Sequence, residues 1–126
     1  MLTLVKKIGA WIGAQIMATE TYGVEPFTYE LKQRIQGSVH MGDHVLQILN
    51  DDTTPMEYVV VLFQIKFELS RAESIQKMQE IHENGKAEIL LSSESVVFEV
   101  AKAIESEAFS KGIGLKCAVV ALKDRS

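Results

Sequence analysis

The chain has 126 residues, 47% of them hydrophobic and 24% charged, which is typical of one ordinary globular domain. Its net charge of -4 argues against a nucleic-acid-binding protein, which needs a basic face to neutralise phosphates, and mildly favours a cationic partner. The single cysteine, Cys117, can form no internal disulfide and can build no metal site alone. It therefore indicates a reducing compartment, and we expect a cytoplasmic protein.

The N-terminal stretch, "MLTLVKKIGAWIGAQIMA", predicts a short amphipathic helix, because its apolar residues recur at helical spacing with Lys6 and Lys7 on the other side. It lacks a clean signal-peptide cleavage pattern and is too short and interrupted to span a bilayer. Docking on protein is favoured over docking on a membrane surface. Residues 19–43 carry weak signals, with one candidate helix from Phe27 to Gln36. Residues 1–43 are thus interpreted as a partly mobile extension.

From His44 the pattern sharpens into a strand, "HVLQIL", followed by the loop "NDDTT" and a helix that opens with "TPME". Thr54 and Glu57 are spaced as a capping box, with Pro55 at the first helical position. This helix is expected to bury one stripe of side chains, namely Met56, Val59, Val60 and Phe63.

A second helix is predicted in "SRAESIQKMQEIHENG", where Ser70 and Glu73 repeat the capping box and Asn84-Gly85 provides a left-handed stop. The residues near its apolar face recur at steps of three and four: Ile75, Met78, Ile81 and His82. "KAEILL" follows as a second strand.

Ser92 or Ser93 is expected to cap a third helix that runs to about Phe109 and ends at the glycines of "KGIG". Its inward side chains are Val97, Val100, Ala101, Ile104 and Ala108. "LKCAVVAL" is a closing strand with a buried run. The order predicts an α+β core domain at residues 44–126, a three-stranded antiparallel sheet with three helices packed on one face.

Two interpretations of the Asn-Asp-Asp loop stay open on residue pattern alone. Asn50 and Asp51 are typical of Asx turns, and Asp52 with Thr54 would satisfy the first helical N–H groups, so the loop needs no ligand. His82, on a largely apolar face, is typical of a half-buried core histidine. No metal-ligand spacing, nucleophile–base motif or phosphate-binding loop occurs, so the sequence predicts no metal, cofactor or enzymatic activity.

From His44 to Leu122 the chain resembles the ClpS family, adaptors that deliver N-degron substrates to the Clp ATP-dependent protease. The loop "NDDTTPME" is similar to the family's signature. The spacing from Met78 to His82, followed by Gly85-Lys86, matches a second hallmark. Several linked motifs at matching separations make this resemblance specific.

The resemblance implies capture of a free protein N-terminus. The α-amino group would be bound by Asn50, Asp51 and His82, with His82 acting directly or through water. The first side chain of the substrate, Leu, Phe, Tyr or Trp, would enter an apolar pocket lined by Thr54, Met56, Val59, Met78, Ile81 and Leu115. In the family the residue at Met56 also screens out β-branched side chains.

The chain departs from the family in the segment that contributes to docking on the Clp-family AAA+ chaperone ring. Here it reads "ILLSSESVVFEVAK", with Ile89 and Leu90 in place of a cysteine and a glycine, and Ser95 and Val100 at two expected charged positions. Nearby residues that could substitute are Glu94, Phe98, Glu99 and Lys102. Two functions follow: an N-degron adaptor for a Clp-type protease, or a ClpS-like peptide-binding or regulatory module with an altered partner. An enzyme is the third and weakest hypothesis.

Overall fold

The computed structural model describes residues 22–38 and 42–125, so the amphipathic helix predicted near the N-terminus lies outside the described residues. In chain order the elements are α3 (Tyr29–Ser38), β1 (His44–Leu49), α4 (Met56–Lys66), α5 (Arg71–Asn84), β2 (Lys86–Ser92), α6 (Glu94–Ser110), β3 (Cys117–Ala121) and the short 3-10 helix η2 (Leu122–Asp124). The three strands form one antiparallel sheet, and the predicted α+β class and element order are confirmed.

The residues group into two compact units. One comprises Pro55–Gln79 with the segment that ends at Pro26, and the other comprises Phe27–Thr54 and Glu80–Ser126. The sheet, α3 and α6 all belong to the second unit.

β1 is the central strand of the sheet, in the order β2-β1-β3. Its four inner residues, Val45 to Ile48, are all buried, as a strand hydrogen-bonded on both sides requires. Against β2, Leu46 pairs with Leu90 while Gln47 pairs with Glu88, which leaves Ile89 as a bulge. β3 is an edge strand and all its residues are partly exposed, so the prediction of a buried closing strand was wrong.

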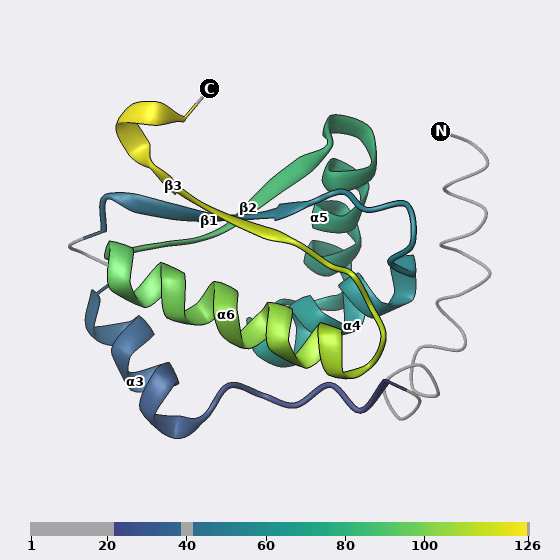
Figure 1. Cartoon of the computed structure of the whole chain (residues 1–126), viewed down its shortest axis with the longest axis horizontal. Coiled ribbons are helices and arrows are strands. Elements are labelled where there is room, and N and C mark those ends of the chain that lie inside the picture. Colours follow the sequence, from purple (N-terminus) through teal and green to yellow (C-terminus); the bar gives the residue numbers. More distant parts are fainter. Residues whose placement is uncertain (1–21, 39–41, 126) are drawn as a thin grey trace. The chain divides into compact units, whose positions relative to one another are not determined.

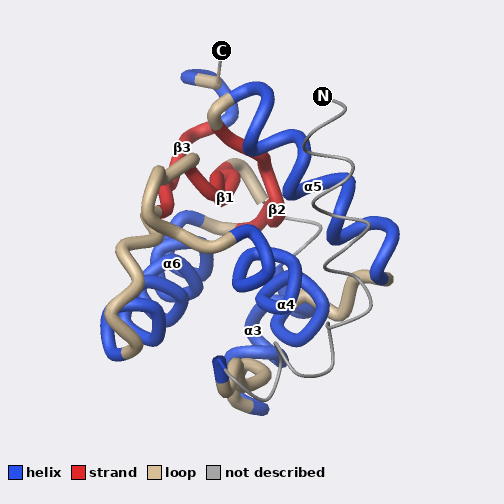
Figure 2. The backbone as a smooth tube through the Cα atoms, turned by 90° about the vertical axis from the view of Figure 1, so that its right-hand side faces the viewer, coloured by secondary structure: helices blue, strands red, loops and turns tan. Residues whose placement is uncertain are grey.

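α6 covers the sheet by contacting β1, β2 and β3, and it runs along the three strands in Figures 1 and 2. Ser93 is its N-cap, and the Ser93 Oγ accepts a hydrogen bond from the Val96 N–H at 3.4 Å. The five side chains predicted to face inward are all buried. Past the end of α6, Gly112 adopts a φ of +74°, which glycine tolerates without strain.

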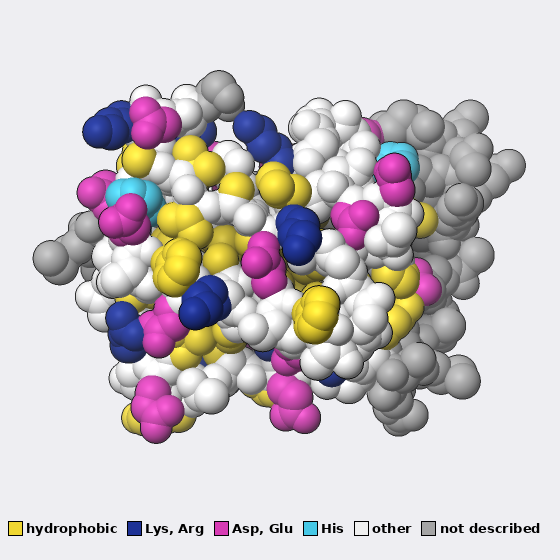
Figure 3. Space-filling view, viewed as in Figure 1, with side chains coloured by type: hydrophobic (Ala, Val, Ile, Leu, Met, Phe, Trp, Pro, Cys, Tyr) yellow, Lys and Arg dark blue, Asp and Glu magenta, His cyan; other side chains and the backbone are white. Residues whose placement is uncertain are grey.

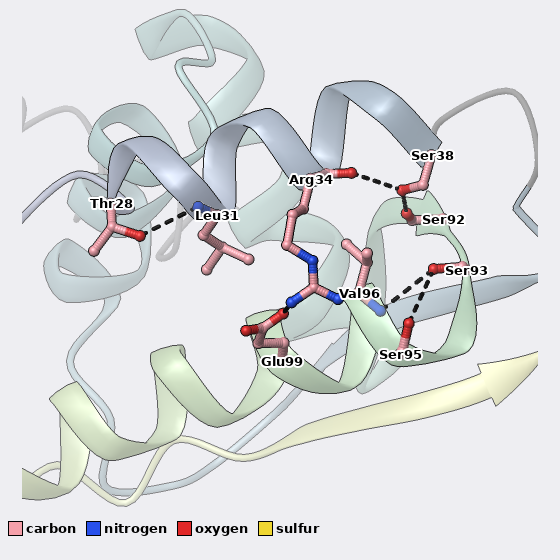
Figure 4. A network of polar contacts seen from close by, with 9 residues as sticks. All are labelled: Thr28, Leu31, Arg34, Ser38, Ser92, Ser93, Ser95, Val96 and Glu99. Atoms are coloured by element: carbon pink, nitrogen blue, oxygen red, sulfur yellow. Dashed lines mark hydrogen bonds and ion pairs between the residues drawn. The ribbon is translucent and has the colours of Figure 1, made fainter.

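α3 packs against α6, although it comes from the predicted extension. Leu31 and the preceding Phe27 are buried. Figure 4 shows the polar contacts beside them: the Arg34 guanidinium pairs with the Glu99 carboxylate, and the Ser38 hydroxyl is hydrogen-bonded to that of Ser92. The candidate helix at residues 27–36 is therefore confirmed, shifted by two residues so that it includes Gly37. The domain boundary at residue 43 stays a prediction.

α4 begins one residue later than predicted, and its capping box was wrong. Pro55 is the N-cap, with extended backbone angles and no side-chain capping bond. Glu57 instead accepts a hydrogen bond from the Tyr22 hydroxyl at 3.2 Å, and Lys66 donates to the Glu25 carbonyl at 2.8 Å. The helix is buried at every position from Tyr58 to Phe63, so its apolar surface is wider than one stripe.

α5 has the local signals that its sequence predicts. The Ser70 N–H donates to Glu73 Oε1 at 3.0 Å and the Glu73 N–H donates to Ser70 Oγ at 3.1 Å, a complete capping box. The helix ends at Asn84, and Gly85 follows with a φ of +87° and an N–H that donates to the Ile81 carbonyl at 2.8 Å. None of the helices within residues 22–38 and 42–125 is long and apolar enough to cross a membrane.

Candidate functional site

Three chain segments of the second unit meet where β1 ends. The Leu49 N–H donates to the Lys116 carbonyl at 3.0 Å, and the Asn50 N–H donates to the Gly85 carbonyl at 2.8 Å. The loop after β1 is thereby held between the end of α5 and the segment that enters β3. This arrangement brings Asn50 and Asp51 close in space to the chain that follows His82.

The Asp51 carboxylate organises this loop. Its Oδ1 accepts from the Thr53 N–H at 3.2 Å, which closes an Asx turn. The Thr53 hydroxyl lies 3.2 Å from Oδ1 and 3.0 Å from Oδ2, and the Thr54 hydroxyl donates to Oδ2 at 2.8 Å. Thr54 thus binds the carboxylate and not a helical N–H. The turn interpretation of Asp51 is confirmed, but it leaves the charge of the side chain available.

The surroundings of Asp51 favour the ionised form of its carboxyl group. The hydrogen bond from Thr54 is the largest cause that lowers the pKa of Asp51, followed by the bond from the Thr53 N–H, and the positive charge of Lys116 contributes in the same direction. The side chain is partly exposed, and its neighbour Asn50 is exposed. A partly exposed carboxylate that stays ionised well below neutral pH, next to a free amide, can accept hydrogen bonds from a cation.

His82 lies in the last turn of α5 and is exposed, so the half-buried core interpretation of this residue was wrong. An exposed imidazole has both ring nitrogens open to a ligand or to water. Within the part of the chain that the structure describes, no group of three or more His, Cys, Asp or Glu side chains could hold a metal ion.

The predicted pocket residues divide between the two units. In the second unit, Ile81 and Leu115 are buried and Thr54 is partly exposed. In the first unit, Val59 and Met78 are buried and Met56 is partly exposed. The assembly of all six into one apolar pocket stays a prediction.

The predicted docking residues lie on α6 and all are exposed. Phe98 is 57% exposed, and the Lys102 ammonium lies 5.7 Å from the centre of its ring, a cation–π contact. Glu99 pairs with Arg34 of α3, and Glu94 Oε2 lies 3.4 Å from His44 Nε2. Figure 3 views the face along which α6 and β3 run, and hydrophobic side chains lie there among acidic and basic ones.

A cavity of about 550 Å³ lies at the other end of β1, around His44. Its lining includes three carboxylates, Asp43, Glu94 and Asp124. His44 Nδ1 is hydrogen-bonded to Asp43 Oδ1 at 2.8 Å, and this bond lowers the pKa of Asp43. The cavity contains none of the residues predicted to bind a substrate terminus.

Three residues of the site were not predicted from the sequence: Thr53, Gly114 and Lys116. Thr53 is the i+2 partner of an Asx turn, a signal that the sequence did contain. Gly114 was assigned only to helix termination, but a Cβ at this position would lie 3.3 Å from Asp51 Oδ2. Lys116 comes from a distant segment, and no local pattern connects it to Asp51.

Comparison with known proteins identifies relatives for most of the chain. Residues 41–118 match the family model described as "ATP-dependent Clp protease adaptor protein ClpS". The ClpS adapter protein of Paracidovorax citrulli is 32% identical over 87 residues, which cover 69% of this chain and 71% of that protein. The ClpS adapter protein of Ralstonia pickettii is 33% identical over 70 residues, 56% of this chain and 65% of that protein, so the chain spans about two thirds of the length of these relatives.

A solved structure also shares the fold. It is that of Agrobacterium tumefaciens ClpS2 bound to L-phenylalaninamide, which matches with a TM-score of 0.59 and 24% identity. The match covers 62% of this chain and 94% of the other.

Proposed function

Because the chain belongs to the ClpS family of ATP-dependent Clp protease adaptor proteins, we propose that it binds the free N-terminal residue of substrate proteins and delivers them to a Clp-type protease. The observation that carries the proposal is the ionised, partly exposed Asp51 carboxylate beside the exposed Asn50 amide. The protein acts in this proposal as a cytoplasmic adaptor and not as an enzyme.

The chemistry of an α-amino group fits these residues. Its pKa is about 7.7–8.0, so at neutral pH it is mostly a cation with three N–H donors. Asp51 supplies the negative charge, and Asn50 and His82 supply two further acceptors. An acetylated terminus has no charge and only one donor, so the same acceptors would bind it poorly.

The second part of the proposal is that an apolar pocket binds the first side chain of the substrate. The six predicted pocket residues are mainly apolar, and two of them are methionines, whose flexible thioether chains adapt to large side chains such as Leu, Phe, Tyr and Trp. That Agrobacterium tumefaciens ClpS2 was solved with L-phenylalaninamide, a ligand with a free amine and an aromatic side chain, supports this choice.

Fluorescence polarisation on a panel of labelled peptides with each of the twenty N-terminal residues tests substrate binding. We expect the peptides that begin with Leu, Phe, Tyr and Trp to bind, and N-acetylation of the Phe peptide to abolish the signal. Equal binding of free and acetylated Phe peptides would contradict the assignment of the amine site.

Delivery is the separate step, and two observations favour the alternative of a ClpS-like module with another partner. Glu99, one of the four predicted docking residues, already pairs with Arg34, while Phe98 places an aromatic ring at the surface of α6. A pull-down with a Clp-type AAA+ chaperone ring distinguishes the two functions. Retention of the protein on the ring supports delivery, and peptide binding without retention supports the altered partner.

A further inference from the structure

The loop residues around Asp51 are arranged to restrain its carboxylate. A carboxylate has about four acceptor positions on its two oxygens. Three donors already point at Asp51: the Thr53 N–H, the Thr53 hydroxyl and the Thr54 hydroxyl, at 2.8 to 3.2 Å. One acceptor position remains for a further donor.

The segment before β3 restrains the same carboxylate from another direction. A Cβ on Gly114 would lie 3.3 Å from Asp51 Oδ2 and 3.7 Å from Thr53 Oγ1, so this glycine lies directly against the two side chains. The Leu49 to Lys116 hydrogen bond fixes the segment in place. The carboxylate therefore has little freedom to rotate, although it is partly exposed.

We propose that Thr53 and Thr54 are positioning residues that hold the Asp51 carboxylate in one orientation, with a single acceptor position open to an incoming ammonium group. This inference rests on the proposed function, and it goes beyond that function by assigning two hydroxyl groups to the orientation of the anion. It also revises Thr54, whose methyl group stays a predicted pocket wall while its hydroxyl belongs to the amine site.

Several charged or titratable groups lie near the loop in space or in sequence. Lys116 comes from the segment before β3, Asp52 lies on the loop itself, and His82, Glu83 and Lys86 are within three residues of Gly85, whose carbonyl accepts from the Asn50 N–H. Substitutions that remove only hydroxyl groups leave all these charges in place. A change in Asp51 can then be attributed to its hydrogen bonds.

The test uses Thr53→Val and Thr54→Val, which keep the size and branching of the side chain, with Thr53→Ser and Thr54→Ser as matched controls that keep the hydroxyl. Loss of one hydrogen bond to a charged partner is expected to weaken binding of a free N-terminal Phe peptide about 3- to 10-fold. The serine variants should restore it. Valine variants that bind as tightly as wild type, or serine variants that bind as weakly as the valine variants, would overturn the proposal.

A second readout separates positioning from a merely structural role. The Thr54 bond lowers the pKa of Asp51, so Thr54→Val should raise that pKa. NMR titration of the Asp51 carboxyl measures this without any peptide. If the wild-type protein binds no peptide, the proposed function fails. The titration still decides the positioning role, because an unchanged Asp51 pKa in Thr54→Val refutes it.

Discussion

Replacing Asp51 by Asn isolates the charge of the amine site from its role in the loop. An Asn side chain keeps an acceptor for the Thr53 N–H, and its amide can donate to the Thr53 and Thr54 hydroxyls, which accept as well as donate. The turn should therefore survive, while the negative charge is lost.

The size of the effect follows from the exposure of the site. A hydrogen bond between two charged groups contributes about 1.5–3 kcal/mol. Because Asp51 is partly exposed, solvent screening places the contribution in the lower part of that range, about 1.5–2 kcal/mol. Asp51→Asn should then weaken binding of a free N-terminal Phe peptide roughly 10- to 30-fold.

Fluorescence polarisation at neutral pH measures this affinity, and urea unfolding of the same samples reports whether the fold is intact. Asp51→Ala, which also removes the loop hydrogen bonds, should remove peptide binding and leave the fold intact. If Asp51→Asn binds the free peptide as tightly as wild type, the carboxylate does not recognise the amine and the site assignment is wrong.

Three further predictions concern other parts of the molecule. Burial, with the charge of Glu105, raises the pKa of the Cys117 thiol to about 12. The thiol should therefore resist alkylation by iodoacetamide at pH 8 until urea unfolds the protein, and rapid alkylation of the folded protein would contradict this prediction. Arg34→Ala should lower the free energy of unfolding by less than about 1 kcal/mol, because the side chains of Arg34 and Glu99 in this ion pair are both 47% exposed. Leu31→Ala should lower it by about 2 kcal/mol or more, because Leu31 is buried. Urea titration compares the two variants, and an equal loss would show that the ion pair contributes as much as the buried leucine to holding α3 in place. Ser93→Ala should lower the free energy of unfolding by about 1 kcal/mol in the same assay, and Ser93→Asp should lower it much less, because aspartate also caps helices. An unchanged midpoint of urea unfolding for the alanine variant would show that the Ser93 cap does not stabilise the protein.

The residues that the sequence predicted well act over short distances along the chain. The Ser70–Glu73 capping box, the Ser93 cap and the glycine stop after Asn84 each join groups no more than four residues apart. Such contacts form almost independently of the rest of the molecule. The motif spacing on which the family resemblance depends is also a property of the sequence alone.

The capping box predicted at Thr54 does not form, and both of its side chains have other hydrogen-bond partners. Asp51 takes the Thr54 hydroxyl, and Tyr22, 35 residues away in the chain, donates to Glu57. Both choices depend on which groups the folded chain brings together, and the box pattern by itself contains no information about them.

The sequence by itself determined the strands, the N-terminal caps of α5 and α6, and the family, because these depend on residue type and on the spacing of motifs along the chain, while the amine-binding residues that the family resemblance implies stay a prediction. Only the tertiary structure decided that β3 is an edge strand, that α3 packs on α6, that Gly114 lies against Asp51, and that the charge of Lys116 acts on Asp51. Those contacts join segments far apart in the chain, and they form only when burial of the core compensates for the entropy of closing the loops between them.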